Sequence, residues 1–311
     1  MEKLGEREPV RSVNPLSTAP SLAVQFFLIP LSVVVVIFAI YGGFRMMVAD
    51  ERSPEEYLAE VSSGGRDRRW PAAYELSRLM DDPEIEERFP DLGPALLRTF
   101  VESDGDDPRV RRYLALAIGR LRYPPSDSVA TLTGALDDPD PETLISVIWA
   151  LASLGDQAVV PRIVEMYQAQ DAGIRKMAVY ALGVLPDDGA HTTLRAALRD
   201  PVTDVQWNAA VSLARHGDDR GLVVLQRMLD REYVSKQVTP SGNVADPVGE
   251  VMISGVRAVA ALGQDGRIEA VRPTLAALAE ADESLKVRQA AMEAIAALER
   301  GTPRERVAER Q

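Results

Sequence analysis

Histidine is the side chain best suited to acid–base or metal chemistry at neutral pH, and this sequence has only two histidines. His191 follows the segment LPDDGA at an expected helix start, and His216 ends an expected helix in SLARHGDD. Neither has a glutamate at ligand spacing, and a metal site needs several ligands with supporting hydrogen bonds. Because the chain has no cysteine, thiolate metal sites, disulfides and a cysteine nucleophile are excluded. We therefore expect no metal and no cofactor.

Paired carboxylates are the remaining candidates for catalysis. Asp-Pro pairs stand at Asp107-Pro108, Asp140-Pro141, Asp200-Pro201 and Asp246-Pro247. An aspartate accepts hydrogen bonds from free N–H groups at a helix start, and proline suits the first helical position. Helix capping therefore explains the regular placement better than catalysis does. The chain also lacks P-loop, GxSxG and GxGxxG signatures. We expect a protein that is not an enzyme.

The charge balance narrows the class of partner. The chain has 311 residues with 35 Lys and Arg against 47 Asp and Glu, a net charge of −12. Phosphate binding needs a basic surface, so nucleic acid is not the expected partner. Aromatic residues are 5% of the chain, too few for a base-stacking platform. A protein partner fits this composition best.

One pattern recurs along the chain and predicts the elements that position these residues. An apolar start position, often followed by arginine, precedes small or apolar residues at offsets of 4, 7, 8 and 11. The start positions are 68, 110, 143, 174, 205, 251 and 287. These offsets share one face of an α-helix, and each such helix follows another amphipathic segment. Such pairs bury both apolar faces only by stacking. We expect an all-α fold, an α-solenoid of about seven helix pairs over residues 54–300.

The segments DDPRVRRYLALAIGRL, DAGIRKMAVYALGVL and ESLKVRQAAMEAIAAL resemble the second helices of HEAT repeats. The short spacing resembles the bacterial variety, including the HEAT-like repeats of phycobilin-lyase proteins, over residues 54–300. The resemblance implies that an acidic residue before each helix and an arginine within it tie successive repeats together. The matching pairs are Asp107/Arg111, Asp171/Arg175 and Glu283/Arg288, and the series is interrupted at Leu144, Gln206 and Met252. HEAT-repeat iron hydroxylases use repeated His-Glu pairs, which this sequence lacks.

An uncharged segment precedes the repeats. Residues 22–44 are apolar apart from Gln25 and Ser32, and a spanning helix needs about 20 such residues. A buried core helix usually has a polar face, and a cleaved signal peptide has a shorter apolar run before an A-x-A-like site. We expect a transmembrane helix at 22–44, after a tail at 1–21 and before a linker at 45–53. Residues 301–311 form a second tail.

The basic residues near the two ends of this segment are nearly balanced, so the positive-inside rule does not fix its orientation. A short N-terminal tail favours an extracytoplasmic repeat domain. Arginine far outnumbers lysine, which is typical of a bacterial source with a high-GC genome. The expected location is a bacterial inner membrane.

Two sets of residues are candidates for partner binding. Trp149 and Trp207 flank the apolar stripe, and Arg112, Lys176 and Asn208 recur near one register as an expected exposed row. Lys236 and Asn243 lie in the insert 233–246, within the largest spacing of the array. Inserts in solenoids form loops on one face, often the binding face. Packing tryptophans, a solvated charged row and a harmless insertion are the alternatives.

These features favour a membrane-anchored scaffold or adaptor that docks a protein, such as a component of an inner-membrane complex. Two alternative functions stay open. In the first, the chain is an accessory subunit or chaperone-like lyase of the bilin-lyase kind. In the second, the array only dimerises.

Overall fold

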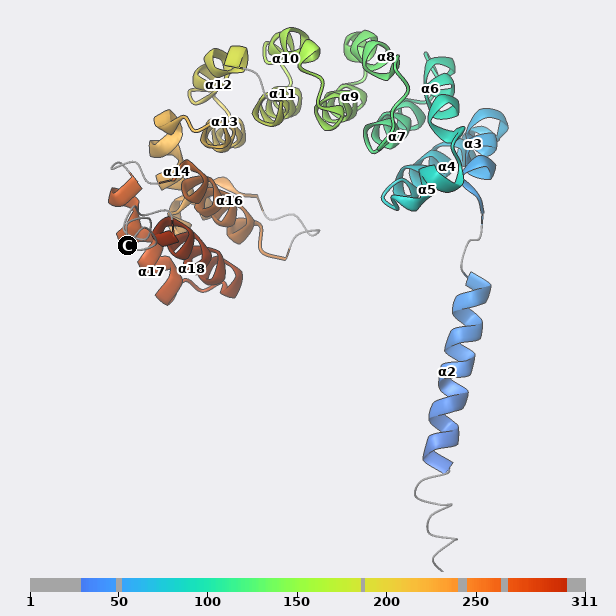
Figure 1. Cartoon of the computed structure of the whole chain (residues 1–311), viewed down its shortest axis with the longest axis horizontal. Coiled ribbons are helices and arrows are strands. Elements are labelled where there is room, and N and C mark those ends of the chain that lie inside the picture. The colour runs from blue at the N-terminus through green and yellow to red at the C-terminus, as the bar shows by residue number, and fades with distance from the viewer. Residues whose placement is uncertain (1–28, 49–51, 186–187, 240–244, 264–267, 301–311) are drawn as a thin grey trace, which may run out of the picture. The chain divides into compact units, whose positions relative to one another are not determined.

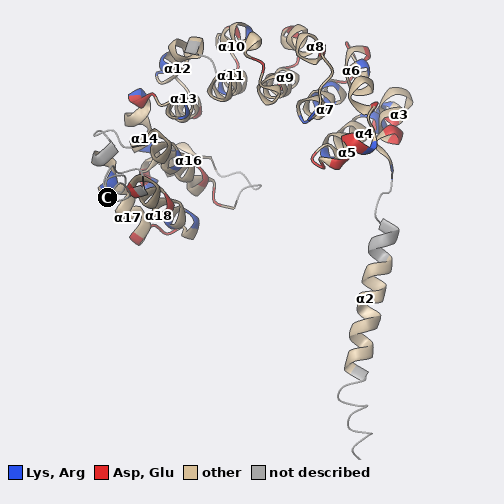
Figure 2. Cartoon of the chain, in the orientation of Figure 1, with Lys and Arg blue, Asp and Glu red and all other residues tan. Residues whose placement is uncertain are grey.

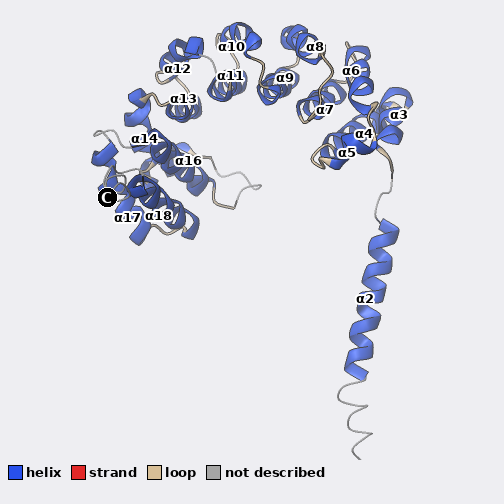
Figure 3. Ribbon diagram, viewed as in Figure 1, coloured by secondary structure: helices blue, strands red, loops and turns tan. Residues whose placement is uncertain are grey.

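The computed structural model describes residues 29–48, 52–185, 188–239, 245–263 and 268–300. The chain divides into two compact units, residues 1–53 and residues 54–311. Within the described ranges every regular element is a helix, as Figures 1 and 3 show. The predicted all-α fold is therefore confirmed for this part of the chain.

The first unit contains α2 (Ile29–Val48), a helix of 20 residues. Its large apolar side chains from Leu31 to Tyr41 are between 47% and 69% exposed. Among the residues that the structure describes, no helix has both the length and the apolarity that crossing a membrane requires. The predicted span 22–44 is therefore not supported. The helix starts at Ile29, and the part of the span within the described residues is shorter than the roughly 20 residues that a crossing needs. Residues 1–28, 49–51 and 301–311 lie outside the description.

The second unit is an array of helix pairs. The first helices of the pairs are α3 (Pro54–Ser63), α6 (Leu92–Glu102), α8 (Ser128–Gly134), α10 (Val160–Met166), α12 (His191–Ala197), α14 (Leu222–Met228) and α17 (Arg272–Ala281). The second helices are α4 (Arg66–Leu79), α7 (Pro108–Gly119), α9 (Pro141–Leu154), α11 (Ala172–Val184), α13 (Thr203–Arg215), α16 (Pro247–Leu262) and α18 (Leu285–Arg300). In Figure 1, α7, α9, α11 and α13 lie on the inner side of the curve, and α8, α10 and α12 lie on the outer side. We call the second helices the inner layer. The solenoid architecture predicted from the periodicity is thus present.

Small residues let successive inner helices approach closely. A Cβ atom added at Gly119 of α7 would lie 2.6 Å from the Cα atom of Ala150 in α9. One added at Gly183 of α11 would collide with the hydroxyl of Ser212 in α13. Only glycine fits such close backbone approaches without displacing the neighbouring helix.

The buried side chains form two hydrophobic clusters that meet at α13. One cluster runs from Tyr57 to Leu213, and the other runs from Trp207 to Leu298. Helix α13 contributes to both, with Leu213 in the first and Trp207 in the second. One face of α13 therefore packs against the preceding repeats and another against the following ones.

Aspartates start several inner helices, as predicted. The side chains of Asp107, Asp140 and Asp246 accept hydrogen bonds from backbone N–H groups in the first turns of α7, α9 and α16. Asp200 differs, because the N-terminal cap of α13 is Val202. Asp200 accepts instead from the Val202 N–H at 2.9 Å and from an arginine of the preceding repeat.

The ion pairs between repeats join different partners from those that the resemblance implied. Arg111 donates to Asp138 at 2.6 Å, and Arg175 donates to Asp200 at 2.9 Å. Each arginine thus reaches an aspartate of the next repeat, which lies close in space, and the aspartates that precede their own helices act as caps instead. Glu283 pairs with Arg231 at 3.0 Å.

The insert between α14 and α16 begins with a helix, which the prediction of a loop over 233–246 missed. Helix α15 (Arg231–Gln237) buries Val234 completely. Its Arg231 forms two hydrogen bonds with Asp282, at 3.0 and 2.6 Å. Asp282 precedes α18, so it occupies the position that Asp200 has before α13. Because α16 has Met252 where α7 and α11 have arginine, the insert provides the arginine that this repeat lacks.

Candidate partner-binding site

One register of the inner layer forms a row of apolar side chains in the first five repeats. The row lies six residues after each of these five repeat starts, and its members are Tyr74, Leu116, Trp149, Tyr180 and Val211. Tyr74 is 39% exposed and the other four are half-buried. Because each member comes from a successive inner helix, the row extends along α4, α7, α9, α11 and α13. We call it the inner row.

Arginines stack on the aromatic members of the inner row. The guanidinium carbon of Arg120 lies 5.2 Å from the centre of the Trp149 ring, on the neighbouring helix. That of Arg215 lies 5.7 Å from the ring of Tyr180. Each such contact contributes about 0.5–1 kcal/mol at an exposed site. The inner row is therefore apolar with cationic edges.

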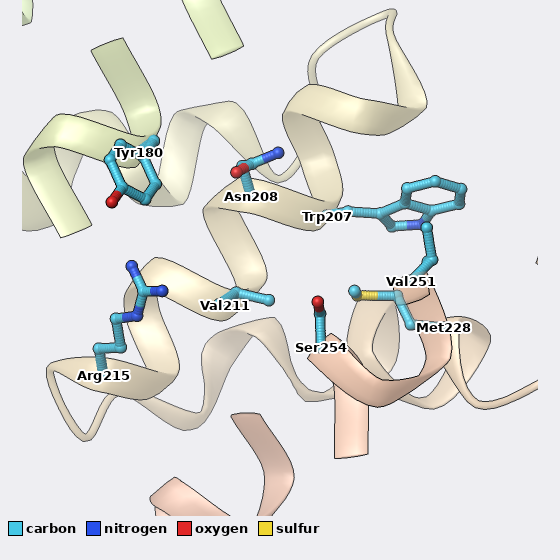
Figure 4. Close-up of a pocket in the computed structure, with 8 residues that line it drawn as sticks. All are labelled: Tyr180, Trp207, Asn208, Val211, Arg215, Met228, Val251 and Ser254. Atoms are coloured by element: carbon cyan, nitrogen blue, oxygen red, sulfur yellow. The ribbon is translucent and has the colours of Figure 1, made fainter. Parts of the chain in front are cut away.

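A pocket of about 280 Å³ opens at the C-terminal end of the inner row. Its lining is Tyr180, Trp207, Asn208, Val211, Arg215, Met228, Val251 and Ser254, as Figure 4 shows. These residues belong to α11, α13, α14 and α16, so the pocket lies where the two hydrophobic clusters meet. Tyr180 and Arg215 lie together at one end, and Trp207, Met228 and Val251 lie at the other.

The polar groups of this pocket differ in whether they have partners. The Asn208 amide donates to the Asp204 carbonyl at 2.8 Å, and the Ser254 hydroxyl donates to the Glu250 carbonyl at 3.0 Å. The indole N–H of Trp207 is buried without an acceptor. For Arg215, the described part of the chain offers no carboxylate at ion-pair distance. The pocket thus combines an apolar wall with an unpaired guanidinium.

The structure brings two of the predicted candidates into this pocket, Trp207 and Asn208. Trp207 is 6% exposed, so it forms the wall rather than an open contact. Arg112 lies 3.6 Å from Asp140, and Lys176 lies 3.6 Å from Asp204.

The other candidates are dispersed. Trp149 lies in the inner row, and Lys236 lies on α15, paired with Glu232 at 2.7 Å. Asn243 is outside the described residues. Sequence reasoning missed Tyr180 and Arg215, although offsets of six and ten residues from each repeat start would have found them.

A second hollow, of about 510 Å³, lies between the starts of α4 and α7. It is lined by arginines and aspartates that pair with one another. Arg69 pairs with Asp106, and Arg109 pairs with Asp107 at 2.7 Å. Since four of the five charged side chains of this hollow are already paired and its lining has no apolar wall, the first pocket is the stronger candidate site.

The two histidines are in contact, although they are 25 positions apart in the sequence. The rings of His191 and His216 lie edge to face with centres 5.1 Å apart. The Nε2 atom of His216 is 3.0 Å from the Leu182 carbonyl, and that of His191 is buried without a partner. Over the described residues, no three His, Asp or Glu side chains are grouped so that they could hold a metal ion.

Comparisons with known proteins agree with the repeat architecture. The family model described as HEAT repeats matches residues 95–183 and 160–238. A comparison with curated proteins finds no match.

Solved structures share the fold at low sequence identity. The complex of CpcE and CpcF of phycocyanin lyase from Nostoc sp. PCC7120 is 18% identical, with a TM-score of 0.51 over 81% of this chain and 96% of that chain. A designed armadillo repeat protein in complex with the peptide (KR)4 is 16% identical, with a TM-score of 0.41 over 80% of this chain and 100% of that chain. Human deoxyhypusine hydroxylase is 16% identical, with a TM-score of 0.34 over 78% of this chain and 84% of that chain.

At 18% identity, the likeness to the CpcE–CpcF complex shows the fold and nothing about activity. The family match covers the central helix pairs, and the flanking pairs continue the same alternation of first and inner helices. The HEAT-repeat match therefore extends over residues 95–238 of this chain.

Proposed function

We propose that this protein is a non-enzymatic scaffold whose HEAT array docks a protein partner on its inner layer, and that the N-terminal segment holds it at a membrane. The inner row is the observation that supports docking. Successive repeats present the same position at regular intervals, which makes an extended surface. Aromatic and arginine side chains are also the types enriched at protein interfaces.

The use of the charged residues supports a scaffold rather than an enzyme. Asp138, Asp200 and Asp282 are buried or nearly so, and each is paired with an arginine of another repeat or of the insert. Such pairs fix the stacking of repeats, and they leave these carboxylates without a free proton-transfer role.

Exposed apolar side chains support membrane attachment. Those of α2 from Leu31 to Tyr41 are about half exposed or more, and contiguous exposed apolar surface marks interaction or membrane sites. With residues 22–28, the apolar segment of the sequence reaches the roughly 20 residues that a span needs. On this proposal, the partner is a component of a bacterial inner-membrane complex, and the repeat domain is extracytoplasmic.

Alkaline extraction of membranes tests the attachment. The full chain should stay in the membrane pellet, and protease added to spheroplasts should digest the repeat domain. Release of the full chain by alkali would show that the apolar segment binds another protein instead. Protection from protease would place the array on the cytoplasmic side.

Site-directed photo-crosslinking tests the docking surface. A photoreactive amino acid at Ser153, which is exposed on the inner helix α9, should capture the partner in the native host. The same group at Val223, which is 61% exposed on α14, should not. Equal capture at both positions, or capture at Val223 alone, would contradict docking on the inner layer.

An accessory role in bilin attachment is the second candidate, and the fold shared with the CpcE–CpcF lyase complex is the observation that favours it. The pocket of about 280 Å³ is below the roughly 300–1,000 Å³ of typical small-molecule sites, which counts against an enclosed pigment. Mixing the full chain with a free bilin and recording its absorbance separates the two. A shifted and enhanced band would favour the lyase-like role.

A further inference from the structure

We propose that the pocket between α11, α13 and α16 binds an acidic segment of the partner protein. One large apolar side chain of that segment fills the cavity, and a neighbouring carboxylate binds Arg215. This inference rests on the proposed docking function and specifies the partner's chemistry at one point of the inner layer.

The size and lining of the cavity favour a single side chain as its occupant. Its volume of about 280 Å³ is small for a whole cofactor. Val211, Met228 and Val251 give it apolar walls, beside the ring of Trp207. Large apolar side chains that enter such pockets are the usual anchors of protein interfaces.

The buried indole N–H of Trp207 favours a peptide over a lipid tail. This donor has no acceptor within the described structure, and an unpaired buried donor costs about 1–3 kcal/mol. A peptide has a carbonyl oxygen beside every side chain, so an inserted residue supplies an acceptor if the indole N–H, which is covered in the unbound structure, turns toward it. A hydrocarbon chain has none.

Arg215 provides the binding group for a carboxylate. It lies at the opposite end of the pocket from Met228 and Val251, stacked on Tyr180. The guanidinium has no carboxylate partner among the described residues, so its N–H edge is available. That edge matches a carboxylate, which it binds through two parallel hydrogen bonds.

Three cations on inner helices near the row already have acidic neighbours. Arg120 donates to Asp81 at 2.7 Å, and Lys176 and Arg112 each lie 3.6 Å from an aspartate. Arg215 differs from these three, since no carboxylate of the described residues lies close enough to pair with it. A carboxylate from a partner is therefore better accommodated at Arg215 than at these three positions.

The distribution of charge between the layers favours the same location. Helices α4, α7, α9, α11, α13 and α16 contain 11 Lys and Arg against 5 Asp and Glu, within a chain whose net charge is −12. The acidic residues of α3 and α5 (Glu84–Arg88) are plain in Figure 2. An acidic segment meets like charge at α3 and α5, whereas beside Arg215 it meets a cation without a carboxylate partner among the described residues.

Peptide selection tests this proposal directly. The full-length chain, purified in a mild detergent, is used to select from a displayed library of random 12-residue peptides. The selected peptides should contain a Leu, Ile, Met, Phe or Trp beside two or more Asp or Glu. Arg215→Gln should weaken a representative selected peptide by about tenfold, the loss expected for one charge-assisted contact.

Two matched pairs of variants control this experiment. Arg98→Gln removes an exposed arginine from the first-layer helix α6 and should change the affinity less than about twofold. Ser254→Glu adds a carboxylate at an exposed lining position and should weaken binding as much as Arg215→Gln does, whereas the neutral Ser254→Gln of similar size should weaken it much less. If the Arg215→Gln variant does not fold, the comparison of Ser254→Glu with Ser254→Gln still tests the proposal.

Enrichment of basic or neutral peptides, no enrichment at all, or binding unaffected by both Arg215→Gln and Ser254→Glu would overturn the proposal. These failures are distinguishable from failure of the docking function. Crosslinking from Ser153 without acidic peptide selection would place the partner elsewhere on the inner layer. Selection of acidic peptides without crosslinking from Ser153 would support the peptide-binding pocket but contradict the scaffold function.

Discussion

Asp200 is 4% exposed, yet its hydrogen bonds favour the ionised form. Burial raises the pKa of this carboxyl, but the hydrogen bonds from Arg175 and from the Val202 N–H outweigh burial, so the pKa lies below its ordinary value. A lowered pKa in the folded state stabilises the fold above the unfolded-state pKa and ceases to do so as pH falls through the folded-state pKa. The pKa values of four other aspartates are lowered too: Asp107, Asp140, Asp218 and Asp246.

Acid should therefore weaken the array, and Asp200→Asn should reduce that effect. We expect wild-type stability to be nearly constant from pH 7 to about pH 5 and to fall below about pH 4. Asp200→Asn should cost about 2–4 kcal/mol at pH 7, because Arg175 loses its charged partner. Urea unfolding followed by circular dichroism at pH 7 and pH 3.5 measures both. If wild type and variant lose equal stability between these pH values, the ionised carboxylate of Asp200 is not the cause.

At the scale of the helix, whether a glycine-to-alanine substitution stabilises or destabilises the array depends on the atoms that the added methyl group contacts. Gly119→Ala should destabilise the array by about 1–3 kcal/mol, since its Cβ would push against Ala150 of the next inner helix. Gly134→Ala, at the end of α8, meets no atom within 4 Å and should be neutral or stabilise by up to about 1 kcal/mol. Thermal melting of the two variants compares them. No destabilisation by Gly119→Ala would mean that α7 and α9 are not in close contact.

Helix α15 offers a second comparison within one element. Arg231→Ala leaves Asp282, which is 3% exposed at its side chain, without its arginine, and should cost about 2–4 kcal/mol. Lys236→Ala on the same helix removes an exposed pair with Glu232 and should cost less than about 0.5 kcal/mol. Hydrogen exchange should show faster exchange in α16 and α18 for Arg231→Ala alone. Unchanged protection in that variant would show that the insert does not support the last repeats.

For the whole molecule, periodicity predicted most of the fold because every helix pair obeys the same 3.6-residue geometry. It did not predict α15, because this helix buries only Val234 and therefore shows no apolar period. It also missed the pairing of Arg111 with Asp138, which lies 27 positions away. The pocket depends on side chains from four helices, and only the stacking of repeats brings Tyr180 and Val251 to the same place. The sequence pattern identified Trp207 and Asn208 as candidate binding residues, but it did not show that they line one pocket.

Removing residues 1–52 should leave the array folded. The described core side chains begin at Tyr57, so the melting temperature should change by no more than about 2 °C in the same detergent, and chelators should have no effect. Circular dichroism of both forms, with and without EDTA, measures this. A large loss of helix beyond that of α2 itself would show that the first unit supports the second.

The meeting of the two hydrophobic clusters at α13 has a consequence for cooperativity. In a linear array, unfolding spreads from repeat to repeat only as far as nearest-neighbour interfaces transmit it. Here the two halves share one helix of 13 residues, so each half should melt as its own cooperative unit, with α13 as the boundary. A peptide bound against α11, α13 and α16 contacts both halves of the array at once. Its binding should therefore merge two unfolding transitions into one.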